Sequence, residues 1–313
     1  MKLELKNVTK KYDLDTLGVE DITFSVQDGI FGIAGEAGSG MMTILGVTGG
    51  WLDADAGEII FDGKVMNDVE PRQRNCLLIC GGKMPLWGSV ERNLTYGLKK
   101  RGISGKEASE RAVLAAEKLG IKSLLRKGAR TLTPFEAIKA NIARLAARGA
   151  AVALFYDPYK GLTYEQKLAA HDALTRVVGE LGCAAVMTVP DGRDLALTGT
   201  YGAVIRNGRV LRSGRVADIL DDPRTAYVAE FTSPVPVNII SEGENTYAVR
   251  ADQMALTSGG YAVVSSGNGY TALETGRGEP PVIVCGETAE KTAGYEIVSR
   301  TVLYDESIRQ RGN

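Results

Sequence analysis

The stretch IFGIAGEAGSGMMTILGV, residues 30–47, decides the fold that this sequence predicts. Its first five residues form a short apolar run, which is typical of a buried strand, and the run ends at Gly35. A glycine-rich loop with Gly38 and Gly40 follows, and an apolar segment then begins a helix. A strand, a glycine loop and a helix start in this order form the arrangement whose backbone N–H groups bind phosphate. The sequence therefore predicts a phosphate-binding loop here.

Strands and helices alternate along the chain on both sides of this loop. Apolar patterning predicts strands at 2–8, 20–26, 57–64, 76–80, 150–158 and 183–189. Helical patterning predicts helices at 89–100, 104–119, 134–148 and 164–181. Ser104 and Glu107 have the spacing of a capping box, and a hairpin at 203–214 is expected to turn at Asn207-Gly208. This alternation predicts an α/β fold with a parallel sheet.

The pattern of the sequence changes from alternating strands and helices to short strand-like pieces after Phe231. TSPVPVN, residues 232–238, is a proline-bearing linker, and short strand-like pieces with glycine turns follow it. We therefore expect an α/β domain at 1–231, with a helical subdomain at about 84–148, and a small β-rich domain at 239–313.

The composition excludes several classes of protein. The 313 residues carry 37 Lys and Arg against 38 Asp and Glu, which excludes nucleic-acid binding through bulk positive charge. The start MKLELKN is not a signal peptide, and no apolar run approaches the roughly 18 residues of a membrane span. The four cysteines follow no CxxC spacing and His171 is the single histidine, so a zinc site is not expected. We expect reduced thiols and, at His171, a partly exposed helix residue.

The order and spacing of these segments resemble the nucleotide-binding subunit of ABC transporters, in particular the importer type with a C-terminal TOBE-like domain. The resemblance covers residues 1–230, and YAVRADQMAL at 247–256 is similar to the opening of such β domains. It implies a P-loop NTPase-like ABC ATPase domain followed by an all-β domain of the OB or TOBE type. It also implies a peripheral position on the cytoplasmic face of the cell membrane, with a membrane-spanning permease and a second ABC ATPase subunit as partners.

The resemblance places a nucleotide site at the glycine loop. An aromatic residue near the N-terminus of the family stacks on adenine, and Tyr12 takes this place; a surface tyrosine at a strand end is the alternative. Met41 replaces the lysine that meets the β- and γ-phosphates, and Met42 replaces the hydroxyl that ligates Mg²⁺. The cofactor-binding candidates are Tyr12, Gly35, Gly38, Ser39, Gly40, Met41, Met42 and Thr43. We expect ATP to bind weakly at most and assign no metal ligand.

The strand-end motif also departs from the family pattern. When LFYDPYKGL, residues 154–162, is aligned with the family motif on Pro158, Tyr156 takes the position of the metal-organising aspartate. Asp157 then takes the position of the catalytic glutamate. Shifting the register by one makes Asp157 the metal partner and leaves Pro158 as the base, a role that proline cannot fill. Either register damages hydrolysis, and Asp157 remains as a degenerate catalytic candidate.

Other positions lack the family's functional groups as well. Pro190 stands where the family has its switch histidine, and Thr163 stands where the family has an aspartate. Cys80 or Gly81 stands where the family has the glutamine that couples the metal site to the membrane partner. Proline has neither a titratable group nor an N–H, so it cannot contact a γ-phosphate as histidine does.

The signature segment before the helix at 134–148 carries the largest change. Where the family has LSGGQ, this chain has Leu132 followed by the degenerate signature Thr133, Pro134, Phe135 and Glu136, while Arg144 keeps its place. Thr133 and Glu136 form a capping box with proline at the first helical position. Such a helix satisfies its own N–H groups, which favours a capped helix with no ligand over a phosphate-binding signature.

Residues 83–98 are the expected coupling surface. Leu86 and Trp87 are the candidate contacts for a cytoplasmic helix of the partner; packing of Trp87 between two lobes is the alternative.

Three functions stay open at this point. The first is a degenerate, non-hydrolysing ATP-binding-type subunit of a membrane importer, and the second is a stand-alone regulatory or scaffold protein that uses the ABC fold for protein contacts. The third is an active transport ATPase. The sequence indicates neither the transported substrate nor whether the dimer is homomeric.

Overall fold

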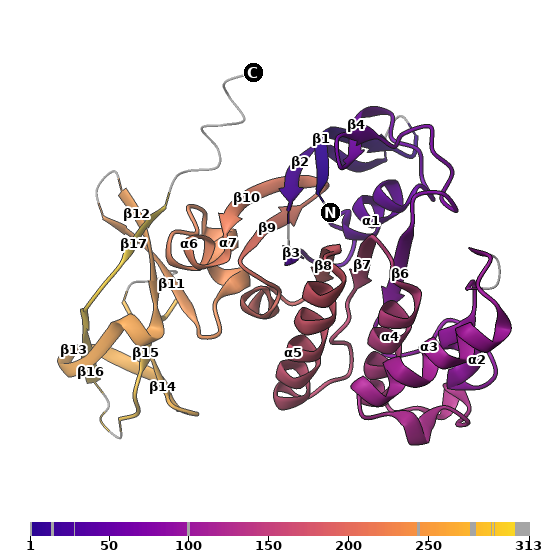
Figure 1. Cartoon of the computed structure of the whole chain (residues 1–313). Coiled ribbons are helices and arrows are strands. Elements are labelled where there is room, and N and C mark those ends of the chain that lie inside the picture. Colours follow the sequence, from indigo (N-terminus) through magenta and orange to yellow (C-terminus); the bar gives the residue numbers. More distant parts are fainter. Residues whose placement is uncertain are drawn as a thin grey trace. The chain divides into compact units, whose positions relative to one another are not determined.

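The computed structural model describes residues 2–13, 16–27, 29–98, 101–242, 245–275, 280–288, 290 and 292–303. The chain divides into two compact units, Met1–Val216 and Ala217–Asn313, each described here by itself (Figure 1). The expected domain bounds of 1–231 and 239–313 stay a prediction, and residues 304–313 of the second lie outside the described residues.

A six-stranded sheet forms the centre of the first unit. In sheet order its strands are β10 (Arg209–Arg215), β9 (Tyr201–Arg206), β3 (Gly29–Ala34), β8 (Ala184–Val189), β7 (Val152–Tyr156) and β6 (Cys76–Cys80). All neighbouring pairs are parallel except β10 with β9. Every residue of β8 is buried, as expected when both faces of a parallel sheet are covered. The expected parallel α/β sheet is confirmed.

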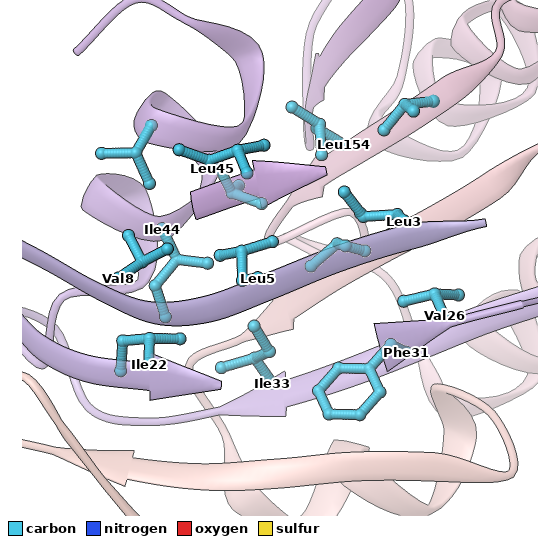
Figure 2. Close-up of a cluster of buried hydrophobic side chains, with 14 of the residues drawn as sticks. Leu3, Leu5, Val8, Ile22, Val26, Phe31, Ile33, Ile44, Leu45 and Leu154 are labelled. Carbon is cyan, nitrogen blue, oxygen red and sulfur yellow. The ribbon is translucent and has the colours of Figure 1, made fainter. Parts of the chain in front are cut away.

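A second, antiparallel sheet packs over the glycine-loop helix. Its strands, in order, are β2 (Leu17–Val26), β1 (Leu3–Lys11), β4 (Ala56–Phe61) and β5 (Lys64–Val65). Helix α1 (Met41–Gly49) places Ile44 and Leu45 in one apolar cluster with Leu5 of β1 and Leu154 of β7 (Figure 2). Because α1 is buried on nearly all sides, the two sheets fix the direction in which its N-terminus points.

The remaining helices of the first unit follow the expected order. They are α2 (Val90–Thr95), α3 (Gly105–Lys118), the short 3-10 turns η2 (Lys122–Leu124) and η3 (Ala129–Thr131), α4 (Pro134–Arg148), α5 (Tyr164–Leu181) and the 3-10 turn η4 (Gly192–Leu197). Helix α2 is shorter than the expected 89–100; residues 99 and 100 lie outside the described part of the chain. The Ser104 hydroxyl accepts the Glu107 N–H, but the Glu107 carboxylate pairs with Arg111. Of the expected capping box, only the hydrogen bond from the Glu107 N–H to the Ser104 hydroxyl is present.

The expected hairpin turn brings a distant segment to the glycine loop. Asn207 and Gly208 both have positive φ, 49° and 77°, as the two-residue turn between β9 and β10 requires. The Gly208 N–H donates to the Ser39 carbonyl at 3.0 Å, and the Gly208 carbonyl accepts from the Glu20 N–H at 2.8 Å. The turn therefore supports the loop from the side of β2.

The second unit contains two short helices and two small sheets. The helices are α6 (Val216–Asp221) and α7 (Ala226–Thr232), and the short 3-10 turn η5 spans Ala251–Gln253. One sheet has the order β11 (Val237–Glu242), β12 (Asn245–Arg250), β17 (Thr301–Leu303). The other has the order β14 (Tyr270–Glu274), β15 (Val282–Cys285), β13 (Met254–Gly267), β16 (Thr292–Ile297). Strands β11 to β17 thus form the expected C-terminal all-β domain, with a core around Val249, Leu273 and Val284.

Within the described residues, no helix has the length and apolar character needed to cross a membrane.

Candidate functional site

The glycine loop leaves β3 and ends at the N-terminus of α1. The Gly35 N–H donates to the Val189 carbonyl at 3.2 Å, which fixes the start of the loop to β8. Gly40 caps α1 with φ 102°, and a Cβ there would lie 2.6 Å from the Gly18 carbonyl oxygen, so glycine is required. The first turn of α1 has neither a capping side chain nor an acidic residue. The N–H groups of this turn therefore form an anion-binding site of the kind found in phosphate-binding loops.

Ser39 contributes a buried hydroxyl inside the loop. The residue is 4% exposed, and its Oγ has no hydrogen-bond partner among the described residues. A Cβ at Gly35 would lie 2.4 Å from this Oγ, so the hydroxyl lies against Gly35 at the start of the loop. A buried hydroxyl without a partner is unfavourable, and an anion in the loop would satisfy it.

The two methionines at the start of α1 differ in burial. Met41 is 3% exposed and belongs to the apolar core between the sheets, whereas Met42 is 43% exposed. The Met41 side chain therefore adds to packing and offers a phosphate no positive charge. A thioether at either position is a weak acceptor and a poor ligand for Mg²⁺.

Tyr12 and Thr43 are brought together by the fold. The Tyr12 hydroxyl and the Thr43 Oγ1 lie 2.9 Å apart in a hydrogen bond that joins the residue after β1 to α1. The Tyr12 residue stays 53% exposed, so a face of its side chain is open to a stacking partner. The sequence placed both residues at this site but did not indicate their bond, which depends on the packing of distant segments.

The end of β7 is held tightly against the end of β6. The Gly81 N–H donates to the Tyr156 carbonyl at 3.0 Å, and a Cβ at Gly81 would lie 1.8 Å from the Asp157 carbonyl oxygen. Tyr156 is half-buried and packs on the apolar core. Asp157 has φ 44°, and burial raises the pKa of its carboxyl while Lys160 opposes that rise. The strand end thus presents one carboxyl group, that of Asp157, beside the phenol of Tyr156.

Three other positions that the resemblance singled out lie at or after the ends of β6 and β8 and at the start of α5. Thr163 caps α5 in a capping box with Gln166, and Pro190 is exposed after β8. Cys80 is half-buried, and burial raises the pKa of its thiol. No group of three His, Cys, Asp or Glu side chains in the described part of the chain could hold a metal ion.

The start of α4 has the expected capping box. The Glu136 N–H donates to the Thr133 hydroxyl at 3.3 Å, and the Glu136 carboxylate accepts the Thr133 N–H at 2.8 Å. The Lys127 ammonium adds an ion pair to Glu136 at 2.9 Å. The Thr133 N–H, the Lys127 ammonium and the Thr133 hydroxyl lower the pKa of Glu136, with the N–H contributing most. This helix end is occupied by its own carboxylate, which opposes a second anion.

His171 lies in the middle of α5 and is partly exposed, as expected, and both of its ring nitrogens have hydrogen-bond partners. The Tyr159 hydroxyl donates to the Leu197 carbonyl at 3.0 Å and lies 3.0 Å from the Nδ1 of His171. Because that hydroxyl has one hydrogen, Nδ1 carries the proton of the neutral imidazole. Burial lowers the pKa of His171, which favours the neutral ring. This network could not be seen in the sequence because Tyr159 lies 12 residues away in a loop.

Leu86 and Trp87 line a groove of about 570 Å³ between the end of β6 and the start of α4. Trp87 is 68% exposed, and the guanidinium of Arg130 lies 2.9 Å from the centre of its ring. The Asn93 side chain bonds both the N–H and the carbonyl of Leu86, which fixes this loop. A mostly exposed Trp87 does not fit the alternative of packing between lobes.

No family model matches the chain. In sequence it is similar to the sn-glycerol-3-phosphate import ATP-binding protein UgpC of Rhodopseudomonas palustris, 28% identical over 76% of this chain and 66% of that protein. The UgpC of Rhizobium meliloti is 25% identical over 84% of this chain and 76% of that protein. The chain thus spans slightly less than two thirds of the length of the R. palustris relative.

Solved structures share the fold of the first unit. An ATP-binding cassette of an ABC transporter, solved in an ADP conformation, superposes with a TM-score of 0.63 at 20% identity and covers 73% of this chain and 98% of that chain. CbiO1 from Clostridium perfringens, part of an ABC transporter complex, gives a TM-score of 0.62 at 19% identity and covers 71% of this chain and 91% of that chain. This chain therefore has the ATP-binding cassette fold of ABC transporters, and its sequence is similar to those of importer ATP-binding proteins.

Proposed function

We propose that this chain is the ATP-binding-type subunit of an ABC importer, and that it binds nucleotide weakly and does not hydrolyse it. The similarity to import ATP-binding proteins supports the first part of the proposal. The observation that carries the second part is the position of Met41. It stands where the resemblance expects a lysine, and its side chain lies in the apolar core at 3% exposure.

The loop fits a phosphate only through backbone and hydroxyl groups. The N-terminus of α1 and the Ser39 hydroxyl would hold the anion, and the Tyr12 side chain would meet a base. Losing one charge-assisted hydrogen bond weakens binding by roughly 1.5–3 kcal/mol, or about 10-fold to 150-fold. We therefore expect ATP to dissociate far more readily than from a loop with lysine.

The residues present do not fit Mg²⁺. Met42 offers sulfur, Tyr156 offers a phenol in place of a carboxylate, and Pro190 offers no side-chain ligand where the resemblance expects histidine. Asp157 is the single carboxylate at the strand end, and burial raises its pKa. We derive no metal-dependent step from this arrangement.

The importer role implies two kinds of partner and a place in the cell. A membrane-spanning permease would dock on the groove of Leu86 and Trp87, and a second ABC ATPase subunit or a second copy of this chain would face the glycine loop. The chain would then lie on the cytoplasmic face of the cell membrane, with β11 to β17 as a TOBE-like domain. Nucleic acid is not a proposed partner.

Two measurements test the proposal. The purified chain is assayed for Mg²⁺-dependent phosphate release from ATP, and a fluorescent ATP analogue is titrated with and without Mg²⁺. We expect no turnover and an affinity that Mg²⁺ does not improve. Steady turnover, or low-micromolar binding that requires Mg²⁺, would instead support an active transport ATPase.

A third measurement tests the importer role itself. The tagged chain is isolated from detergent-solubilised membranes, and the proteins that accompany it are identified. A permease and an intact ATPase subunit are expected. If the chain is recovered without any membrane protein, the stand-alone regulatory or scaffold function is favoured.

A further inference from the structure

A cavity of about 680 Å³ lies at the end of the central sheet where β3 and β9 begin. Its walls come from the end of β2, the first residues of β3, the middle of α5 and the connection from η4 to β9. The glycine loop leaves the opposite end of β3, and the six residues of this strand span about 20 Å. The cavity is therefore separate from the candidate nucleotide site, and its volume suits a small molecule.

The walls of this cavity are held together by contacts between distant segments. The Lys167 ammonium of α5 donates to both carboxylate oxygens of Asp194 in η4, at 2.6 and 2.7 Å. A Cβ at Gly199 would lie 2.3 Å from the Ile30 carbonyl oxygen, so the connection after η4 lies directly on the start of β3. A ligand would therefore meet walls that are already in place, which lowers the entropic cost of binding.

The lining is polar but carries no formal charge. Hydroxyl, amide, phenol and imidazole groups come from six of the lining residues, namely Ser25, Gln27, His171, Thr175, Thr200 and Tyr201. Among the described residues that line the cavity there is no Asp, Glu, Lys or Arg; Asp28 lies outside the described residues. Apolar surface is added by Ile30 and by the ring of Tyr201, a residue that is 53% exposed. Such a lining offers hydrogen bonds and apolar contact to a neutral ligand but no counter-ion to a charged one.

His171 presents a hydrogen-bond acceptor at this cavity. Its Nδ1 carries the proton and donates to the Tyr159 hydroxyl, so its Nε2 has a free electron pair. The Thr175 hydroxyl lies 3.3 Å from Nε2, which is long for a hydrogen bond, and a helical threonine can instead donate to the carbonyl four residues earlier. Nε2 is therefore available to a ligand that brings an O–H donor.

We propose that this cavity binds an uncharged polyhydroxylated ring, a monosaccharide or a cyclitol, in addition to any nucleotide at the glycine loop. The edge of such a ring carries hydroxyl groups, which donate to the Nε2 of His171 and bond the neutral polar side chains of the lining. The C–H groups on its face pack on the ring of Tyr201. A charged ligand would lose its hydration at this site without gaining an ion pair from the described lining.

The single histidine of the chain makes a specific reporter. The full chain, made without a histidine tag and with ¹⁵N-labelled histidine, is titrated with myo-inositol and with the methyl α-glycosides of glucose, galactose and mannose. We expect Nδ1 to be the protonated nitrogen of the free chain and at least one of these rings to shift the Nε2 signal saturably, also when ATP is present in excess. If none of the four rings shifts the signal, or if ATP displaces the ring, the proposal is wrong.

Charged counterparts of the ring that binds test the neutral character of the site. The uronic acid and the amino sugar differ from that ring by one carboxylate or one ammonium group. We expect both to bind at least about 10-fold more weakly, because a charge that loses water without a partner is disfavoured. Equal or tighter binding of either counterpart would overturn the assignment to an uncharged ligand.

A pair of tyrosine variants assigns the binding to this cavity. Tyr201→Ala should weaken binding by about 2-fold to 12-fold, the range of one lost ring contact. Tyr164→Ala, at an exposed tyrosine of α5 outside the cavity, is the matched control and should leave the affinity unchanged. Equal affinity of the two variants would overturn the proposal. None of these measurements depends on hydrolysis or on a permease, so their outcome leaves the proposed function untouched.

Discussion

Arg74 should determine the stability of the helix that carries the glycine loop. The residue is 3% exposed, and its guanidinium donates to four backbone carbonyls, those of Val47, Thr48, Asn67 and Val69, at 2.8–3.2 Å. Two of these carbonyls lie in the last turn of α1. A cation at a helix C-terminus complements the helix dipole, and it satisfies carbonyls that the helix itself leaves open.

The expected cost of losing Arg74 follows from these contacts. In Arg74→Met the stem is kept but the four carbonyls lose the guanidinium as a donor; the Val47 carbonyl still accepts the Gly50 N–H at 3.2 Å. Each unsatisfied buried carbonyl costs about 1–3 kcal/mol, but the sum is smaller because local relaxation and water relieve part of it. We expect the free energy of unfolding of the first unit to fall by about 3–5 kcal/mol, the range seen when a buried charged network is broken. With a urea slope of about 2 kcal/mol per molar, the midpoint falls by about 1.5–2.5 M.

Urea unfolding followed by Trp51 emission measures this effect, because Trp51 follows α1 directly and packs against Gly49. Trp87→Phe removes the other tryptophan from the signal. Arg74→Lys keeps the positive charge but loses the planar set of N–H donors of the guanidinium. We therefore expect it to lower the free energy of unfolding by about half as much as Arg74→Met does. Arg72→Met, an exposed arginine two residues away, is the matched control and should change stability by less than about 0.5 kcal/mol. If Arg74→Met were no more harmful than Arg72→Met, the assignment of these hydrogen bonds would be refuted.

Three further results are expected. Met41→Lys should not restore Mg²⁺-dependent phosphate release, because Tyr156 still lacks a carboxylate; robust turnover by this single variant would contradict the proposed loss of hydrolysis. The interactions that lower the pKa of Glu136 stabilise the fold at pH values above the ordinary carboxyl pKa of about 4.5. This stabilisation is lost as the pH falls. Glu136→Gln should therefore melt below wild type at pH 7, and this gap should narrow as the pH falls below 4.5; a constant gap would contradict the capping role. Burial raises the pKa of Cys76 to about 12, so iodoacetamide at pH 8 should modify exposed Cys285 well before Cys76, as peptide mass spectrometry would show.

Local patterns predicted the parts of the fold that local chemistry controls. The Asn207-Gly208 turn and the capping box at Thr133 depend on residues that lie next to one another or three apart, so the sequence displays them directly. The same holds for the strand, loop and helix order around Gly40. The structure agrees with these expectations because no distant segment is needed to make them.

Contacts between distant segments could not be predicted in this way. The bond between Tyr12 and Thr43 joins residues 31 apart, and Arg144 reaches a carbonyl 66 residues away. Arg74 looks like an ordinary surface arginine in the sequence, and its burial depends on how the loop before β6 folds over α1. Periodicity shows which face of a helix is apolar, but it does not show which polar side chain will meet an open carbonyl.

The joint between α4 and β6 explains how the fold persists without the groups of the signature. Arg148 donates to the Cys76 carbonyl at 3.0 Å, and Arg144 donates to the Leu78 carbonyl at 2.8 Å. Four residues of helix advance about 6 Å and two residues of strand about 6.6 Å, so the two arginines match alternate carbonyls of an edge strand. These contacts involve no residue of the glycine loop or of the start of α4. Since the helix is fixed by its middle and its end, the fold does not depend on a particular sequence in the first turn of α4.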